Sequence, residues 1–267
     1  RPAMAHALSI VVPTYEEAEN VRSLCTRLFA ATRAAGLNAE LLLVDDDSGA
    51  GTLATCAAVD TLRAEGYDVR AHVRRRHEGK GLSSAVLLGL RLARHDVLLV
   101  MDADLQHEPE SAPAVAAPVL NGAAEFAVGS RNVSGGKVAD GWPLTRRLIS
   151  NGATLLARPL TPCSDPMSGF FCLSRKTLRR AEKARLNPMG YKIGLELMVR
   201  ARCTAVQEVP ITFRDREHGE SKLSMKQNAL YLMHLAHLYV FAFPCTLSLT
   251  LVVALAMACA GLRALAR

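Results

Sequence analysis

Short apolar runs alternate with segments of helical periodicity through the first hundred residues. Apolar runs suited to buried strands occupy residues 7–12, 40–44, 68–73 and 96–101. Between them, apolar residues recur at helical spacing over residues 17–35, 53–63 and 82–93. Strands that alternate with helices in this way are typical of a mainly parallel sheet lying between helices. The pattern therefore predicts an α/β fold.

The second half of the chain continues with less regular spacing. Strands are expected over residues 125–129, 168–174 and 205–213, and helices over 143–156 and 193–202. Residues 133–141 are rich in glycine, which predicts a mobile loop. Residues 222–243 form an expected amphipathic helix with Leu223, Leu230, Met233 and Leu238 on one side. Such a helix is suited to lie in a membrane interface.

The C-terminal part of the chain is strongly apolar. Residues 238–262 contain no charged side chain, and about 20 apolar residues are enough to cross a bilayer. A buried helix would be the alternative, but the length and the flanking arginines favour a transmembrane anchor over 244–262. Basic residues preceding it outnumber those that follow, which predicts a cytosolic catalytic domain. The expected organisation is a domain over 1–221, an interfacial helix over 222–243 and the anchor.

Charge and cysteine content limit the class of partner. The net charge of +7 suits an anionic partner, which could be nucleic acid, an anionic membrane surface or a phosphorylated substrate. The seven cysteines are scattered and contain no C-x-x-C pair. They indicate free thiols in a reducing compartment, and neither a disulfide framework nor a zinc site is expected.

Acidic residues cluster where the predicted strands end. The fourth strand runs into Asp102-Ala103-Asp104, whose two carboxylates could hold Mg²⁺ or Mn²⁺ against a substrate diphosphate. The chain has neither a G-x-G-x-x-G nor a G-x-x-x-x-G-K-[ST] motif, so a metal is the expected phosphate binder. Tyr15 and Glu17 could contact a base and ribose beside the acids that end the second strand, although acids at these positions could equally cap helices.

Several longer motifs point to a family. The first group comprises VPTYEEAEN (12–20), VDDDS (44–48), GKGL (79–82), MDADLQH (101–107), GSR (129–131) and GESKL (219–223). A more specific group comprises GWP (141–143), RRLISNGA (146–153), SDPMSGF (164–170) and VPITF (209–213). With these motifs the chain resembles family 2 glycosyltransferases of the dolichyl-phosphate mannosyltransferase group over residues 8–223.

The resemblance implies a GT-A fold, a Rossmann-like arrangement, and transfer of mannose from GDP-mannose to dolichyl (polyprenyl) phosphate with inversion. The product would be dolichyl β-D-mannosyl phosphate, made at the endoplasmic reticulum membrane. Because the chain carries its own expected anchor, accessory subunits are not expected. The resemblance also implies a divalent metal, Mg²⁺ or Mn²⁺ with Ca²⁺ possible, and no nucleic-acid partner. Such a lipid-linked mannose serves N-glycosylation, O-mannosylation and GPI-anchor synthesis.

Roles by position also follow from the resemblance. The guanosine would be held by Pro13, Tyr15, Glu17, Val44, Asp45 and Asp46. Asp102, Asp104 and Gln106 would bind the metal, and with Ala103 they would gather the diphosphate. The acceptor phosphate would contact Arg131, Arg146 and Ser150, which with Asp104 form the expected catalytic set. Arg216 and Lys222 would close over the donor phosphates.

Two alternatives stay open at this point. One is a polyprenyl-phosphate glucosyltransferase that uses UDP-glucose, and the other is a non-catalytic basic module that binds nucleic acid or anionic lipid. Asp165, Glu196 and the basic run over 74–77 are left without a role.

A phosphate monoester is already anionic near neutral pH, so a lipid phosphate would need cationic positioning and no general base.

Overall fold

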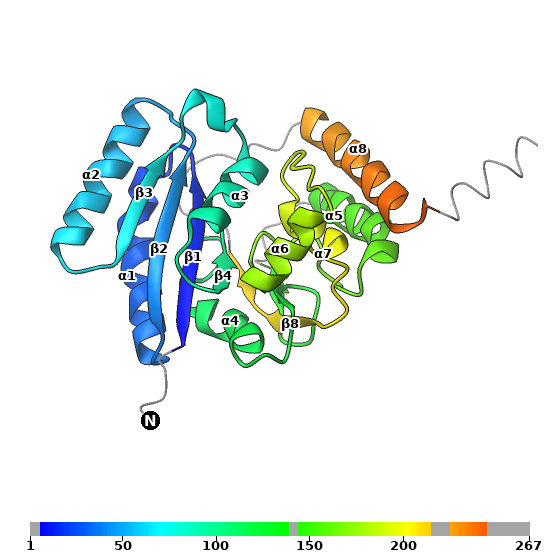
Figure 1. Cartoon of the computed structure of the whole chain (residues 1–267), viewed down its shortest axis with the longest axis horizontal. Helices are drawn as coiled ribbons and strands as arrows, with labels where there is room; N and C mark the ends of the chain where they lie inside the picture. The colour runs from blue at the N-terminus through cyan, green and yellow to red at the C-terminus, as the bar shows by residue number, and fades with distance from the viewer. Residues whose placement is uncertain (1–5, 139–143, 215–224, 245–267) are drawn as a thin grey trace, which may run out of the picture.

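The chain forms a layered α/β structure around one sheet in the computed structural model, which describes residues 6–138, 144–214 and 225–244 (Figure 1). The sheet has seven strands in the order β3-β2-β1-β4-β7-β5-β8. Their bounds are β1 (Ala7–Thr14), β2 (Asn38–Asp45), β3 (Val69–Val73), β4 (Val97–Val100), β5 (Phe126–Ser130), β7 (Phe171–Ser174) and β8 (Val206–Pro210). Strand β7 runs antiparallel to β4 and β5, whereas the other pairs are parallel. The predicted mainly parallel sheet is confirmed.

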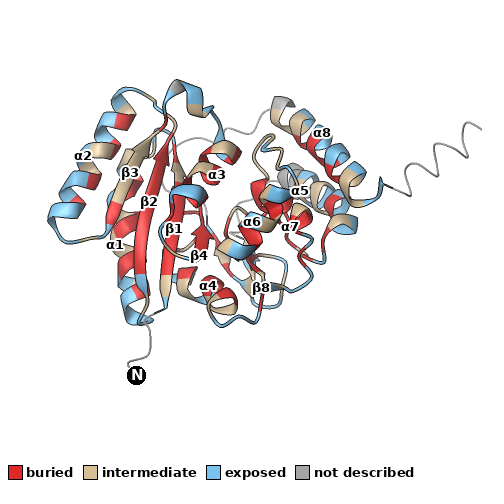
Figure 2. Ribbon diagram, in the orientation of Figure 1, coloured by how far each residue is buried: buried red, intermediate tan, exposed pale blue. Residues whose placement is uncertain are grey.

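Helices cover both faces of this sheet. One face packs against α1 (Ala18–Ala34), α2 (Ala50–Ala64) and α4 (Ala112–Leu120), and the other packs against α3 (Leu82–Leu92), α6 (Arg175–Lys183) and α7 (Ile193–Arg200). Strand β1 shows how alternation builds the two layers, because Ile10 and Val12 enter one cluster and Val11 enters the other. The central strands are buried between partly exposed helices, whereas the edge strands β3 and β8 are only partly buried (Figure 2).

Helix α3 lies unusually close to the sheet at Gly89. A Cβ atom there would be 2.3 Å from Val11 Cγ1 and 2.9 Å from Val44 Cγ2. Only a residue without a side chain lets the helix backbone approach these strands so closely. This contact fixes α3 above the carboxyl ends of β1 and β2, where α3 also begins.

Two helices and several strand boundaries differ from the prediction. Helices α4 and α6 were not predicted: α4 contains Pro118 and is apolar on most faces, and α6 is dominated by basic residues. The predicted strand over 205–213 divides into β8 and β9 (Thr212–Phe213). Strand β9 pairs with β6 (Lys137–Val138), so part of the predicted mobile loop over 133–141 is ordered as a strand. Residues 139–141 lie outside the described part of the chain. The described residues also contain three 3₁₀ turns, η1 (Arg76–Glu78), η2 (Pro109–Ser111) and η3 (Arg158–Leu160).

Helices α5 (Leu144–Ala157) and α8 (Met225–Ala242) pack outside the three layers, next to α7 (Figure 1). The Tyr231 hydroxyl donates to the Ala153 carbonyl at 2.7 Å, and the Tyr239 hydroxyl donates to the Leu156 carbonyl at 2.7 Å. Leu235 and Leu238 of α8 are buried in the same contact. Helix α8 is thus fixed to the domain along one face.

The predicted membrane location needs correction. Within residues 6–138, 144–214 and 225–244, no helix is long and apolar enough to cross a membrane. The prediction of an endoplasmic reticulum protein with a single C-terminal span is therefore wrong by this finding. Residues 245–262 of the proposed span lie outside the described chain.

Candidate active site

A large cavity lies at the carboxyl ends of the central strands. The chain leaves β1 toward β2 and β3 on one side and later returns to β4 on the other, and ligands of open α/β sheets bind at such a reversal. The cavity has a volume of about 1120 Å³. Ten of the residues expected to bind substrate or metal line it, namely Pro13, Tyr15, Glu17, Asp46, Asp102, Ala103, Asp104, Gln106, Arg131 and Ser150.

The remaining expected residues are placed differently. Val44 and Asp45 are fully buried at the end of β2 and do not line the cavity. The side chain of Arg146 and all of Arg216 and Lys222 lie outside the described part of the structure. Their expected contacts with the acceptor phosphate and with the donor phosphates stay predictions.

Asp45 holds the turn that leads from β2 into α2. Its carboxylate accepts hydrogen bonds from the Thr14 hydroxyl at 2.9 Å, from the Asp47 amide at 3.1 Å and from the Thr52 hydroxyl. A buried carboxylate with three donors is well satisfied within the protein. Asp45 therefore acts behind the cavity wall and supports the residue that follows it.

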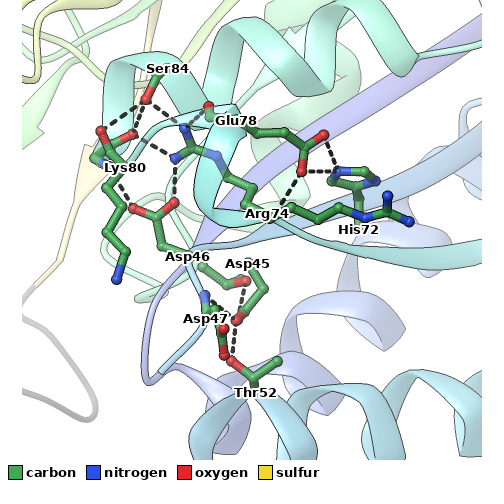
Figure 3. A network of polar contacts seen from close by, with 12 residues as sticks. Asp45, Asp46, Asp47, Thr52, His72, Arg74, Glu78, Lys80 and Ser84 are labelled. Carbon is green, nitrogen blue, oxygen red and sulfur yellow. Dashed lines mark hydrogen bonds and ion pairs between the residues drawn. The ribbon is translucent and has the colours of Figure 1, made fainter. Parts of the chain in front are cut away.

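Asp46 belongs to a second network, with Arg74 at its centre (Figure 3). The Arg74 guanidinium donates to the Asp46 carboxylate, to the Ser84 hydroxyl at 2.7 Å and to the Glu78 carbonyl at 2.7 Å. The Gly81 amide donates to Asp46 Oδ2 at 2.6 Å. Arg74 is only 4% exposed, so the first residue of the basic 74–77 run is an internal support. It fixes the GKGL segment beside the cavity.

The acidic turn after β4 presents its three expected metal ligands together. The Gln106 amide donates to Asp104 Oδ1 at 3.2 Å, and Leu105 adopts a left-handed conformation with φ of 59° that tightens the turn. The side-chain nitrogen of Gln106 donates to the Arg214 carbonyl at 3.1 Å. That bond turns the amide oxygen of Gln106 away from Arg214, so it can serve as a ligand atom.

The fit of this turn to a divalent cation rests on its neighbours. A Cβ atom on Gly169 would lie 2.8 Å from Asp102 Oδ2, so the glycine backbone forms a cradle around that carboxylate. Within the described residues, no group of three or more His, Cys, Asp or Glu side chains could hold a metal. Mg²⁺ commonly uses one or two carboxylates and completes its shell with water and substrate phosphates. Two aspartates and one amide oxygen fit that requirement.

His107 is a buried site residue that the sequence reasoning did not identify. Its ring lies between Phe170 and Phe213, with centroid separations of 5.3 Å and 5.1 Å. Its Nδ1 atom is 3.9 Å from Asp102 Oδ2 and has no hydrogen-bond partner among the described residues. Burial lowers the pKa of His107 to about 4, so the ring is neutral at physiological pH. The sequence signal that could have identified His107 was its position directly after the MDADLQ segment.

Arg131 is held in place by a carboxylate whose role the sequence left open. Asp165 is fully buried and accepts from the Arg131 backbone amide at 3.0 Å, from Nε at 2.8 Å and from an Nη atom at 2.7 Å. Burial alone would raise the pKa of Asp165, but hydrogen bonds and charge from Arg131 outweigh it and keep that pKa below its usual range. The guanidinium lies 5.0 Å from the Phe213 ring centroid. The arginine head is therefore rigid.

Glu196, the other acid left open, lies away from the cavity lining and joins two helices. It is fully buried and accepts from Arg200 Nε at 3.0 Å and from the Asn187 amide at 2.7 Å. Its second oxygen is 2.7 Å from His234 Nε2 on α8. His234 is 1% exposed, so it faces the domain interior. This network fixes α8 to α7.

The outer wall of the cavity is formed by α5 and α8 and is largely apolar. Ser150 lies on α5 next to Ile149, which is 61% exposed. On α8, Leu232 lines the cavity and is 57% exposed. Exposed apolar side chains beside a polar site indicate a partner that carries an apolar part. The cavity thus joins an acidic turn, a fixed arginine and an apolar opening.

Comparisons with known proteins agree with this geometry. The family model described as Glycosyl transferase family 2 matches residues 9–181. A dolichol-phosphate mannosyltransferase of Mycosarcoma maydis is 44% identical over 88% of this chain and 80% of its own length. The one from Saccharomyces cerevisiae is 43% identical over 90% of both chains.

Solved structures of low sequence identity share the fold. The chain superposes on a mannosyltransferase from Pyrobaculum calidifontis in complex with GDP-Man and Mn²⁺ with a TM-score of 0.59. The identity is 13%, and the match covers 91% of this chain and 70% of the other. At that identity the likeness concerns the fold alone, and it is the GT-A-like fold expected from the motifs. The chain belongs to glycosyl transferase family 2, in the group of the dolichol-phosphate mannosyltransferases.

Proposed function

We propose that this protein is a metal-dependent enzyme that transfers mannose from GDP-mannose to dolichyl phosphate with inversion, giving dolichyl β-D-mannosyl phosphate. One observation carries the proposal. A single cavity brings the Asp102–Asp104 turn, suited to a metal-bound diphosphate, together with the fixed guanidinium of Arg131, suited to a second phosphate. A reaction between two phosphorylated substrates needs both features in one place.

The guanosine end of the donor is assigned to the β1 and β2 side of the cavity. Tyr15 is 42% exposed at the rim, where its ring can contact a base, and Pro13 and Glu17 line the same wall. The Glu17 carboxylate accepts from Asn20 at 2.8 Å, which orients it. Val44 and Asp45 support this wall from behind, and Asp46 closes it through Arg74.

The diphosphate is assigned to the β4 turn, with Asp102, Asp104 and Gln106 as ligands of Mg²⁺ or Mn²⁺ and Ala103 beside them. When bound, the cation would neutralise charge on the departing diphosphate. The backbone of Gly169 leaves room for the Asp102 carboxylate in this position, because a Cβ atom there would lie 2.8 Å from Oδ2. Arg216 and Lys222, which lie outside the described residues, are proposed to contact the same phosphates.

The acceptor phosphate is assigned to Arg131, Arg146 and Ser150. The phosphate oxygen that attacks C1 of the sugar is already an anion, so no residue has to remove a proton. What the protein supplies is orientation. Arg131 is restrained by Asp165 before substrate arrives, and a restrained donor loses little freedom when it binds an anion.

The apolar part of the acceptor is assigned to the opening between α5 and α8. Ile149 and Leu232 line the cavity and also reach solvent, as a groove for an isoprenoid chain would require. Met233 is 53% and Val240 is 61% exposed on the outer face of α8, which supports contact with a lipid surface over the predicted interfacial segment 222–243. Residues 222–224 of that segment lie outside the described chain.

The test is a transfer assay with purified protein. Radiolabelled GDP-mannose, Mn²⁺ and a polyprenyl phosphate in detergent should yield a labelled product that extracts into organic solvent and releases mannose in mild acid. Chelation should stop the reaction and added metal should restore it. UDP-glucose supplied in equal amount should not compete. Folded protein that neither binds GDP-mannose nor responds to metal would contradict the proposal and favour a non-catalytic basic module.

A further inference from the structure

Lys192 is a partly buried cation in the active-site cavity that neither the motifs nor the comparisons assign. It directly precedes α7 and lines the cavity. Its ammonium donates to the Met167 carbonyl at 2.6 Å and lies 4.6 Å from the centroid of the Tyr191 ring. The position of the ammonium is therefore defined by two contacts on different segments.

The charges around Lys192 place it between the two halves of the site. Burial and the positive charge of Arg131 lower the pKa of Lys192 to about 8, and the negative charges of Asp102 and Asp165 oppose that decrease. Those three residues belong to the metal turn and to the Arg131–Asp165 pair. Lys192 lines the same cavity as Asp102 and Arg131, so its ammonium is near the proposed positions of both the donor and the acceptor phosphate.

A purely structural role explains this lysine poorly. Removing an ammonium from water is costly unless it gains several hydrogen bonds or a close counter-ion. An ammonium has three donors, and within the described residues one of them has a hydrogen bond, to the Met167 carbonyl. A methionine of similar length would fill the same space without the cost. The remaining donors are available toward the cavity that Lys192 lines.

We propose that Lys192 contacts the reacting phosphates, with its ammonium placed where the sugar 1-phosphate of the donor meets the acceptor phosphate. This inference rests on the proposed function. In that reaction an acceptor oxygen forms a bond to C1, and the bond from C1 to the diphosphate oxygen breaks with its electron pair. No proton moves. Negative charge builds on the leaving oxygen, and a fixed ammonium nearby stabilises that charge more than it stabilises the bound substrate.

The Met167 carbonyl holds the Lys192 ammonium in a fixed position. Met167 belongs to the segment that ends at Gly169, and the Ser168 hydroxyl ties that segment to β5 through the Gly129 carbonyl at 2.7 Å. The same segment cradles Asp102 through Gly169. Lys192 and the metal turn are thus held by one short stretch of backbone, which keeps the distance between ammonium and diphosphate constant.

The test compares Lys192→Met, Lys192→Arg and a control, Lys176→Met. Lys176 is an exposed lysine on α6, at the opposite end of the sheet from the cavity, and it undergoes the same chemical change. The readouts are kcat and KM for mannosyl transfer, the affinity for GDP by calorimetry, and the melting temperature. Lys192→Met should lower kcat about 100-fold, which corresponds to about 2.7 kcal/mol.

The other expected values separate contact with the reacting atoms from packing. GDP affinity should fall as well, because the terminal phosphate of GDP carries the charge that the ammonium contacts. The melting temperature should not fall, because a desolvated charge has been removed. Lys192→Arg keeps the charge with a bulkier head, so its kcat should be about tenfold below wild type. Lys176→Met should match wild type in all three readouts. If Lys192→Met does not fold, the tenfold decrease in Lys192→Arg is the deciding measurement.

Several results would overturn the inference. Wild-type kcat in folded Lys192→Met would do so, as would a lower melting temperature with unchanged kcat per folded molecule. If only Lys192→Arg folds, a wild-type kcat in that variant would also overturn the inference. Wild-type protein that transfers no mannose at all would instead overturn the proposed function, and this inference would fall with it.

Discussion

Replacing Asp165 by asparagine tests whether the active-site arginine depends on its buried partner. Asn has the same shape, so the substitution removes a charge without creating a cavity. Asp165 is fully buried and the Arg131 side chain is 11% exposed. Breaking a buried ion pair by neutralising one partner typically costs about 3 to 5 kcal/mol, because the other charge is left without compensation. Asn retains one acceptor oxygen, so we expect a loss near the lower end, about 3 kcal/mol.

This loss is large enough to measure in two ways. In a chain of this size each kcal/mol shifts the melting temperature by about 2 to 4 °C, so Asp165→Asn should melt about 6 to 12 °C below wild type. Urea unfolding should give a lower midpoint with an unchanged slope. Asp60→Asn is the matched control. Asp60 is exposed, with its nearest cation, Arg63, at 3.9 Å, and its substitution should change stability by less than about 0.5 kcal/mol.

The pH dependence follows from the direction of the pKa shift. The folded protein holds the pKa of Asp165 below its unfolded value, so the carboxylate stabilises the fold above the unfolded pKa of about 3.9 and loses that contribution as pH falls through the folded pKa. The gap between wild type and Asp165→Asn should be full at pH 7 and should narrow below about pH 4.

A double-mutant cycle with Arg131→Met completes the test. Each single substitution leaves a buried charge uncompensated, whereas the double substitution removes both charges. The double variant should therefore be more stable than the sum of the two losses predicts, by at least about 1 kcal/mol. Additive losses would refute the pairing. Stability of Asp165→Asn within about 0.5 kcal/mol of wild type would refute the argument from buried charge itself.

Three further substitutions test the metal turn and the sheet. Asp104→Asn should lower mannosyl transfer by about 100-fold or more and abolish its dependence on Mn²⁺, and an unchanged metal titration would contradict the ligand assignment. Gly169→Ala places a Cβ atom 2.8 Å from Asp102 Oδ2, so activity should fall at least about tenfold while the melting temperature changes little. Gly89→Ala meets Val11 Cγ1 at 2.3 Å and should destabilise the fold by about 1 to 3 kcal/mol. Its kcat per folded molecule should be unchanged, since α3 carries no reacting group.

Periodicity predicted the central layers because burial imposes it on the sequence. Strand β1 alternates Ile10 and Val11 between two cores, and α1 places its apolar residues on one stripe. The helices that were missed lack this signal. Helix α4 has Pro118 within it and is apolar on most faces, and α6 buries only a narrow stripe beneath basic side chains. Their helical state depends on packing against the sheet more than on local preference.

Some features of the site could be predicted from adjacent residues in the sequence, and others could not. The Asp102–Asp104 turn was predictable because it directly follows a buried strand. The partnership of Arg131 with Asp165 joins residues 34 positions apart, and that of Arg74 with Asp46 joins residues 28 apart. Such pairs depend on the topology of the sheet, which a single sequence does not encode locally. For the same reason Asp45 was expected to contact nucleotide and instead supports the turn.

The pairing of Arg131 with Asp165 also predicts that the site discriminates between phosphates. An unpaired buried guanidinium would bind any small anion, whereas Arg131 with Asp165 is nearly neutral as a unit. A neutral pair attracts a phosphate only at short range and in the right orientation, through the donors that the carboxylate leaves exposed. Removing Asp165 should therefore do more than destabilise the fold. Inorganic phosphate should inhibit Asp165→Asn at lower concentration than it inhibits the wild type, because the arginine would hold the competing anion with its full charge.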